Sequence, residues 1–265
     1  MNPSIDVGAD TPTVSRGILH LLPVPIAADS GPAILPARTL EAMFQLGCFV
    51  VENARSARRA LKELGHPGPM QQLDIREIPA GKEQARLGES VLADLLAPLT
   101  AGHAVGVLSE SGCPGIADPG AELARWAQRN GHAVQPHVGP SSLLLALMGS
   151  GLEGQRFSFH GYLPVDGPGR IAALQALELR SRQERAAQLF IETPYRNDAM
   201  VQALLTALQP GTLVSVACDL TGSAELLRTR SVRLWRESPP LLPRLPTVFL
   251  LQALSAPAAS PRRRA

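Results

Sequence analysis

The stretch LSESGCPGIADPG, residues 108–120, gathers glycine, proline and polar side chains into one short segment. It follows HAVGVL (103–108), whose apolar composition predicts a buried strand, so residues 109–117 are expected to form a loop at the carboxyl end of that strand. In open α/β sheets ligands bind at this end of the strands, and glycine lets the backbone approach them closely. Gly112 and Gly115 are therefore candidate ligand contacts. A rigid turn that binds nothing would explain the same composition.

The residues after this loop predict a helix. Asp118 followed by Pro119 suits an N-cap and a first helical residue, and Asn130 with Gly131 suits the helix end. The loop would therefore connect a strand to a helix, which is the type of connection that carries ligand-binding loops in α/β proteins.

Strand-like and helical segments alternate along the whole chain, an order typical of mostly parallel sheets covered by helices. The predicted strands form two sets, 17–22, 47–51, 103–108 and 132–138, then 157–163, 187–192, 212–218 and 247–253. We therefore expect two α/β domains in series, 15–137 and 138–254. Residues 1–14 and the basic segment 255–265 are expected to be loose tails.

Composition indicates a globular protein without an overall preference for nucleic acid. Of the 265 residues, 45% are apolar and 18% are charged, and the formal net charge is only +2. No general basic field therefore indicates a nucleic-acid partner, although a local basic surface remains compatible with one. The three cysteines are widely spaced, the first residues do not resemble a signal peptide, and no apolar run is long enough to cross a bilayer. We expect a cytoplasmic protein with no membrane partner.

Seven blocks of the sequence follow one another in a recognisable order. They are LLPVPI (21–26), VENARSARRALKEL (51–64), SESGCPGIADPG (109–120), VGPSS (138–142), RFSFHGYLP (156–164), ETPYR (192–196) and ACDLTG (217–222). In this order they resemble the motifs of the tetrapyrrole methylase-like family, in its branch of small-subunit ribosomal RNA 2′-O-methyltransferases. The resemblance covers about residues 17–253.

The resemblance implies a methyltransferase of two consecutive α/β domains with mostly parallel or mixed sheets, S-adenosylmethionine bound in the cleft between them, and a homodimer. Methyl transfer from a sulfonium depends on the alignment of acceptor, methyl carbon and sulfur, because the donor supplies most of the reactivity. No metal is needed for this chemistry. The six histidines and three cysteines show no metal-ligand spacing such as C-x-x-C, so we expect no metal site.

The resemblance places cofactor contacts in four of the blocks, in the last of them at Tyr195. They are Pro25, Ile26, Gly112, Cys113, Gly115, Ile116, Ser141, Ser142 and Tyr195. Some have ordinary structural explanations as well. Cys113 could be a packing residue or a reactive thiol, Ser141 and Ser142 could cap the helix that begins there, and Tyr195 could pack in its turn.

The acceptor side of the expected site departs from the family pattern. Where the branch has E-D-T-R, this chain has Glu52, Asn53, Ala54 and Arg55, so the second carboxylate is absent. Glu52 is the first candidate to accept the proton of a ribose hydroxyl, and Glu110 is the competing base. Glu52 could instead be a helix-start charge that the helix dipole favours.

The predicted helix after Glu52 carries basic residues along one side and small or apolar residues along another. The basic residues are Arg55, Arg58, Arg59 and Lys62. Such a face could bind the phosphates of an RNA or the carboxylates of a tetrapyrrole, or it could be an ordinary solvated surface. We take Arg55, Arg58 and Arg59 as candidate substrate contacts.

Three functions remain open from the sequence. The order of the blocks favours a methyltransferase that acts on RNA ribose. A tetrapyrrole or another small-molecule acceptor is the alternative, because Arg170 is the only cation in VDGPGR (165–170) and Gly222 stands where the branch commonly has lysine. A catalytically silent cofactor-binding protein is the third, suggested by the missing carboxylate at Asn53. Steep salt dependence of RNA binding would favour the first.

Overall fold

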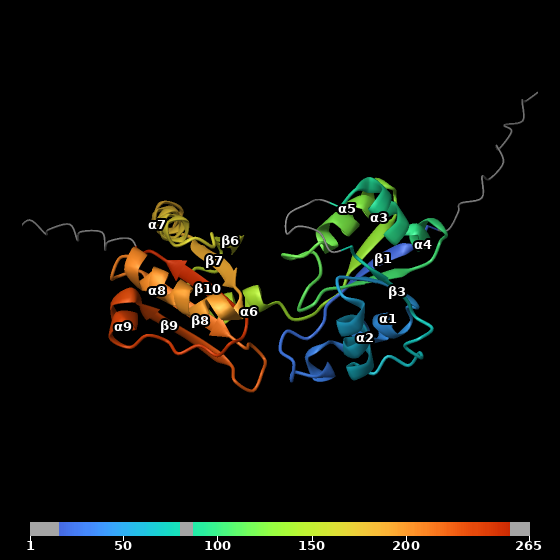
Figure 1. Ribbon diagram of the computed structural model, residues 1–265, viewed down its shortest axis with the longest axis horizontal. Coiled ribbons are helices and arrows are strands. Elements are labelled where there is room, and N and C mark those ends of the chain that lie inside the picture. The colour runs from blue at the N-terminus through green and yellow to red at the C-terminus, as the bar shows by residue number, and fades with distance from the viewer. Residues whose placement is uncertain (1–15, 80–86, 255–265) are drawn as a thin grey trace, which may run out of the picture. The chain divides into compact units, whose positions relative to one another are not determined.

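The computed structural model describes residues 16–79 and 87–254 (Figure 1). The predicted tails, 1–14 and 255–265, lie outside the described residues. The chain divides into two compact units. One comprises the chain up to Val24 together with Leu35–Gly139, and the other comprises Pro25–Ile34 together with the chain from Pro140 onward. The segment Pro25–Ile34 therefore clusters with the second unit although strands of the first unit precede and follow it.

The first unit is built on a fully parallel sheet of five strands in the order β3-β2-β4-β1-β5. The strands are β1 (Ile18–Leu22), β2 (Cys48–Val51), β3 (Asp74–Glu77), β4 (Val105–Leu108) and β5 (Ala133–Pro136). Every residue of β2 and β4 is buried, as expected for inner strands that are covered by helices on both faces. Parallel strands place their carboxyl ends at one edge, so the loops after β2 and β4 are neighbours.

Five helices cover this parallel sheet within the described residues. They are α1 (Ala37–Phe44), α2 (Ala54–Glu63), α3 (Glu89–Leu95), α4 (Ala97–Thr100) and α5 (Gly120–Arg129). A core that includes Leu19, Val107 and Trp126 joins one face of the sheet to α3, α4 and α5. Figure 1 shows α1 and α2 on the other side of the sheet.

The second unit is built on a mixed sheet of five strands in the order β6-β7-β10-β8-β9, in which only the β6-β7 pair is parallel. The strands are β6 (Phe157–Tyr162), β7 (Ala187–Glu192), β8 (Leu213–Cys218), β9 (Leu226–Ser231) and β10 (Thr247–Gln252). The expectation of α/β architecture with mostly parallel or mixed sheets is thus confirmed.

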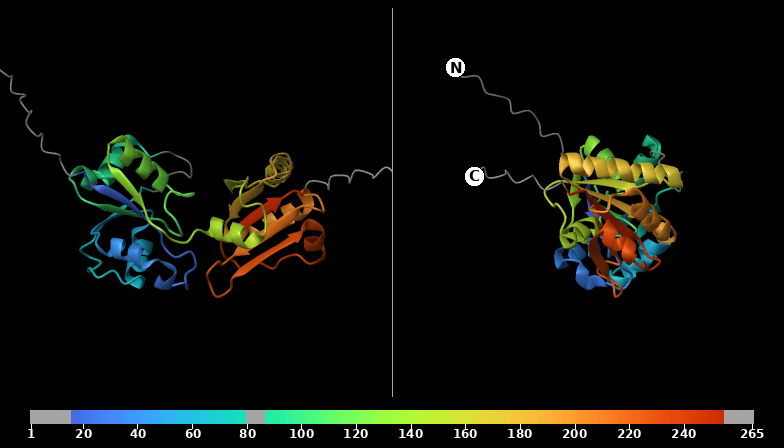
Figure 2. Two further views of the ribbon diagram at one scale, coloured as in Figure 1. Left: turned by 180° about the vertical axis from the view of Figure 1, so that it is seen from behind. Right: turned by 90° about the vertical axis from the view of Figure 1, so that its left-hand side faces the viewer.

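Helices lie on both faces of this mixed sheet. They are α6 (Ser142–Ser150), α7 (Gly167–Glu184), α8 (Asn197–Ala207) and α9 (Val232–Glu237), with short 3-10 turns η1 (Pro32–Ile34) and η2 (Pro194–Arg196). One core packs α7, α8 and α9 against the sheet around Phe190 and Phe249. A second core packs α6 against the opposite face. The views of this unit agree, because α8 lies in front of the sheet in Figure 1 and α6 lies in front of it in the reversed view of Figure 2.

The sequence predicted eight of the observed strands but not β3 or β9. Both are edge strands with charged residues, DIRE in β3 and LLRTRS in β9, and neither has the apolar run from which the other strands were predicted. The helix predicted from Pro119 begins one residue later, at Gly120, and ends as expected at Asn130 with Gly131 in a left-handed conformation (φ 76°).

No helix in 16–79 or 87–254 combines the length and apolar character that crossing a bilayer requires.

Candidate functional site

The loop between β4 and α5 is held in a tight, partly left-handed conformation. Gly112 (φ 72°), Gly115 (φ 86°) and Ala117 (φ 63°) all have positive φ, which explains the glycines at two of these positions. The carbonyl of Gly112 accepts hydrogen bonds from Val24 N at 3.0 Å and from Ser109 Oγ at 3.0 Å. The predicted ligand-binding loop is therefore a preformed element of the first unit.

Asp118 fixes the second half of this loop. Its Oδ1 accepts a hydrogen bond from Gly115 N at 2.6 Å and another from Gly120 N, in the first turn of α5, at 2.8 Å. The cap predicted at Asp118 is thus made by its side chain, although the helix starts after Pro119. Because the N–H of Gly115 is engaged within the loop, a ligand contact at Gly115 requires another atom of that residue.

Glu52 lies beside this loop, where the sequence placed it. It follows the last residue of β2, and Val51 is in register with Leu108 at the end of β4. Burial raises the pKa of the Glu52 carboxyl, and the charges of Asp118 and Glu110 raise it further. A hydrogen bond from the Glu110 backbone to this carboxyl partly offsets the increase. A half-buried carboxylate with a raised pKa binds a proton more readily than an ordinary glutamate, which suits a general base.

Glu110 differs from Glu52 in its contacts. Its Oε1 accepts a hydrogen bond from Ser56 Oγ at 2.7 Å, which ties it to the first turn of α2. Burial raises the pKa of the neighbouring Asp118, and hydrogen bonds from the Gly115 and Gly120 backbone partly offset this increase. The three acidic side chains thus lie around one loop, and burial raises the pKa of both Glu52 and Asp118.

Asn53 caps α2. Its Oδ1 accepts hydrogen bonds from Arg55 N and Ser56 N, each at 3.0 Å, and Glu77 Oε2 accepts one from Ala54 N at 2.8 Å. The N–H groups of the first helical residues, Ala54, Arg55 and Ser56, therefore all have acceptors. Glu52 is not needed to cap this helix. An aspartate at position 53 would cap equally well, so its replacement by asparagine leaves a structural role intact.

The predicted basic face of α2 is exposed. Ala57 and Leu61 are buried, whereas Arg55, Arg58 and Arg59 are exposed. Arg58 Nη1 donates to the carbonyl of Ala54 at 3.4 Å. Within the described part of the chain, none of these three arginines forms an ion pair. Their charges are therefore available to a ligand.

Cys113 and Ile116 line the same loop with apolar surface. Ile116 is 52% exposed, unusually open for isoleucine beside a candidate site. Cys113 is half-buried, and burial followed by the charge of Asp118 raises the pKa of its thiol. A raised thiol pKa disfavours the reactive thiolate considered from the sequence.

The remaining predicted cofactor contacts belong to the second unit. Pro25 and Ile26 begin the segment Pro25–Ile34, and Ile26 packs against the core around α6. Ser30 Oγ lies 2.7 Å from Thr221 Oγ1, and Ser223 N donates to Asp29 Oδ2 at 3.0 Å. The turn after β8, which belongs to the ACDLTG block, therefore anchors the segment that carries Pro25 and Ile26.

Ser141, Ser142 and Tyr195 also have defined positions in the second unit. Ser141 is the N-cap of α6, with its Oγ accepting from Leu144 N at 3.5 Å, and Ser142 is the first helical residue. Tyr195 is 80% exposed. The guanidinium of Arg196 lies 5.9 Å from its ring centroid.

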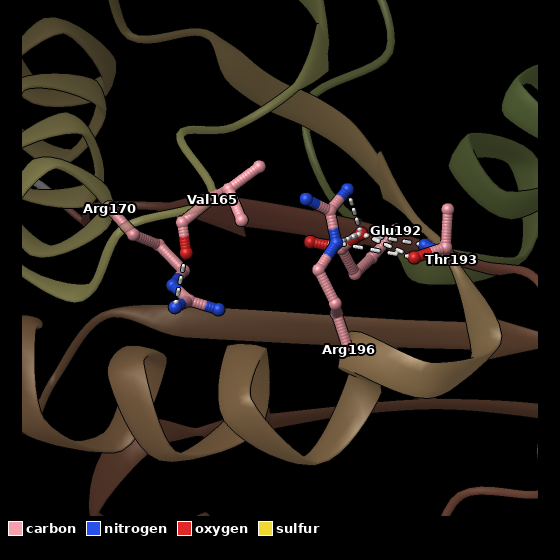
Figure 3. Close-up of polar contacts among 5 residues, drawn as sticks. All are labelled: Val165, Arg170, Glu192, Thr193 and Arg196. Atoms are coloured by element: carbon pink, nitrogen blue, oxygen red, sulfur yellow. Dashed lines mark hydrogen bonds and ion pairs between the residues drawn. The ribbon is translucent and has the colours of Figure 1, made fainter.

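Sequence reasoning missed a buried charged cluster in the second unit, formed by Arg170, Glu192 and Arg196 (Figure 3). A glutamate at the end of an apolar strand and an arginine four residues later were the available signal. Among the residues that the structure describes, no group of three or more histidine, cysteine or acidic side chains could hold a metal.

No family model matches the chain. Curated proteins do match it. It is 31% identical over 215 residues to the ribosomal RNA small subunit methyltransferase I of Mesorhizobium japonicum, covering 81% of this chain and 67% of that protein. It is 29% identical over 213 residues to the protein of the same name from Escherichia coli O157:H7, covering 80% of this chain and 68% of that one. The chain thus spans about two thirds of the length of these relatives.

Solved structures share the fold. A uroporphyrin-III C-methyltransferase of Thermus thermophilus in its native form superposes with a TM-score of 0.54 over 89% of this chain and 97% of that one, at 18% identity. A second structure of the Thermus thermophilus enzyme gives a TM-score of 0.50 at 17% identity, covering 89% of this chain and 94% of that one. At such identities the likeness concerns the fold.

Proposed function

The chain belongs to the ribosomal RNA small subunit methyltransferase I family, with the tetrapyrrole methylase fold, and we propose that it transfers a methyl group from S-adenosylmethionine to a ribose hydroxyl of RNA. The observation that carries the RNA acceptor is the exposed, unpaired arginine face of α2, which begins directly after the half-buried carboxylate of Glu52. We also propose that the reaction takes place in the cytoplasm.

The residues of the loop after β4 fit this cofactor. Bound S-adenosylmethionine would supply an electrophilic methyl group on a positively charged sulfur. The carboxylates of Glu52, Glu110 and Asp118 create the negative potential that stabilises a cation. Ile116 offers exposed apolar surface beside them. We propose that Gly112, Cys113, Gly115 and Ile116 contact the cofactor. Contacts by the second unit's Pro25, Ile26, Ser141, Ser142 and Tyr195 stay predictions from the family resemblance.

The chain's own residues would then bind and deprotonate the acceptor. Arg55, Arg58 and Arg59 bind backbone phosphates and set the register of the RNA. Glu52 would accept the proton of the ribose hydroxyl when that oxygen is methylated. Glu110, already bonded to Ser56, contributes negative charge. No metal is assigned a role.

The experiment that tests this proposal is methyl transfer from labelled S-adenosylmethionine to RNA, followed by digestion to nucleosides. We expect the label on the ribose. Label found on a base would contradict the proposed acceptor atom, and an absence of transfer to RNA of any kind would contradict the proposed function.

S-adenosylmethionine is expected to bind the protein in the presence of a metal chelator, because every proposed contact is made by side chains or backbone. Calorimetric titration measures this directly. Binding that requires added divalent metal, or no detectable heat at millimolar cofactor, would contradict the assignment.

Gly120→Ala is expected to weaken S-adenosylmethionine binding on the order of tenfold. A Cβ at Gly120 would lie 2.7 Å from Gly115 N and 2.9 Å from Asp118 Oδ1, so the loop would have to shift. Alanine is otherwise the better helix residue, so thermal melting should show a retained fold. Gly47→Ala is the matched control, because its Cβ would meet nothing within 4 Å. Equal cofactor affinity of the two variants would place the site elsewhere.

We further propose that the protein is a homodimer, as the family resemblance implies. Light scattering at micromolar concentration should give the mass of two chains, and the mass of one chain would contradict this.

A further inference from the structure

A buried polar cluster lies at the carboxyl ends of the parallel strands β6 and β7 in the second unit. Glu192 is the last residue of β7 and is 2% exposed, and Arg170, in the first turn of α7, is 8% exposed. Arg196 closes η2, and 17% of its side chain is exposed. Figure 3 draws these side chains, which come from three different elements. The proposed cofactor and base residues of the first unit do not include them.

The carboxylate of Glu192 is bonded on one side only. Oε1 accepts hydrogen bonds from Thr193 N at 2.7 Å, from Thr193 Oγ1 at 3.2 Å and from Arg196 Nε at 2.8 Å, and it lies 2.7 Å from Arg196 Nη2. Oε2 is buried and accepts no hydrogen bond from the residues that the structure describes. The several donors at Oε1 fix the carboxylate, and Oε2 can accept a hydrogen bond from a further donor.

Arg170 has a donor group without an acceptor among the described residues. Its Nη2 donates to the carbonyl of Val165 at 3.0 Å. Its Nε is buried and, across the described residues, has no acceptor. The cluster therefore lacks one acceptor for Arg170 and one donor for Glu192, and buried groups of this kind normally have partners.

The charges of the cluster are also unbalanced. Two guanidinium groups accompany one carboxylate, and buried charge without compensation is unfavourable. A phosphate would supply the missing negative charge and an acceptor for Arg170, since guanidinium groups suit phosphate oxygens. A phosphate alone would not satisfy Glu192, whose free oxygen needs a donor. A ribose phosphate carries both, because its 2′-hydroxyl can donate a hydrogen bond.

We propose that Arg170, Glu192 and Arg196 form a binding site for a ribose phosphate unit of RNA, with the phosphate on the arginines and the 2′-hydroxyl on Glu192 Oε2. This inference rests on the proposed function and extends it by a second RNA contact, separate from α2. The exposed ring of Tyr195 offers a face on which a neighbouring unstacked base can stack. Because DNA lacks the 2′-hydroxyl, the site distinguishes RNA from DNA.

Access to the site requires a local movement. Residues 164–168 are exposed, and the carbonyl of Val165 in this segment holds Arg170. A phosphate oxygen replaces that carbonyl as the acceptor of Arg170 when the segment moves aside. Hydrogen exchange in residues 164–169 should therefore change when RNA binds.

The test compares a single-stranded RNA oligonucleotide with DNA of the same sequence, using fluorescence anisotropy on the full chain. We expect the unaltered protein to prefer RNA. Glu192→Gln should lower the ratio of RNA to DNA affinity about tenfold, the usual effect of losing a hydrogen bond to a charged group. Arg170→Met should weaken RNA binding by a similar factor, and because DNA carries the same phosphate its effect on the ratio should be smaller. Arg182→Met, on the exposed surface of α7, removes the same charge and should affect RNA and DNA equally.

Two outcomes decide the inference separately from the proposed function. If the unaltered protein methylates RNA but Glu192→Gln keeps the affinity ratio of Arg182→Met, the ribose phosphate site is wrong and the function stands. If the unaltered protein methylates no RNA, the proposed function fails whatever the oligonucleotides show. Glu192→Gln preserves the shape of the side chain, so a ratio is measurable even if Arg170→Met does not fold.

Discussion

Glu52→Gln is expected to lower the rate of methyl transfer roughly 10²–10⁴-fold, the range for loss of a general base. Glutamine keeps the size of the side chain but cannot accept the ribose proton. The affinity for S-adenosylmethionine should change far less than the rate, because Asp118 holds the second half of the loop after β4 and glutamine can still accept the hydrogen bond from the Glu110 backbone. Single-turnover rates and calorimetric titration measure the two quantities separately.

The pH dependence gives an independent readout of the same carboxylate. A general base works only above its pKa, and the pKa of Glu52 is raised by burial and by the charges of Asp118 and Glu110. Activity should therefore fall on acidification at a higher pH than an ordinary glutamate would give, and Glu52→Gln should lose this limb. Glu110→Gln is the comparison, and we expect it to lower the rate of methyl transfer less than Glu52→Gln does. A normal rate in Glu52→Gln together with a large loss in Glu110→Gln would transfer the base to Glu110.

Arg55→Ala and Arg58→Ala are each expected to weaken RNA binding and to reduce the slope of log affinity against log salt by about one. A phosphate contact releases counterions when it forms, so its loss makes binding less sensitive to salt. The rate of methyl transfer from the bound complex should change less than the affinity. Binding titrations over a range of salt concentrations provide the slope.

Arg125→Ala is the matched control for these variants, because Arg125 is exposed on α5 and has the same charge. Its slope should equal that of the unaltered protein. If all three variants have the same slope as the unaltered protein, the basic face of α2 is an ordinary solvated surface, and a small-molecule acceptor becomes the better assignment.

The fold was predictable where strands are apolar and loops carry glycine. CFVV and VGVL are buried in full as β2 and β4, and Gly112 and Gly115 have the positive φ that their loop requires. The charged edge strands β3 and β9 were not predictable, because their pairing depends on neighbours distant in sequence. The hydrogen bonds that join the segment Pro25–Ile34 to Thr221 and Ser223 were not predictable either, because they connect residues far apart in the sequence.

The residue types of the candidate site could be predicted from the sequence, but most of its hydrogen bonds could not. The sequence places Glu52 beside the loop after β4, but only the structure shows that Asn53 caps α2 and that Asp118 engages the N–H of Gly115. The cluster joins Glu192 and Arg196 of the ETPYR block to Arg170, which lies outside the seven blocks. Its unpaired atoms depend on side-chain geometry, for which the sequence has no signal.

Methyl transfer to RNA ribose is tested most directly with labelled S-adenosylmethionine and small ribosomal subunits whose RNA lacks this ribose methylation. A tetrapyrrole precursor is assayed in parallel. The account predicts label in the ribosomal RNA, none in the tetrapyrrole, and loss of the RNA signal in Glu52→Gln. Label in the tetrapyrrole and none in the RNA would contradict it.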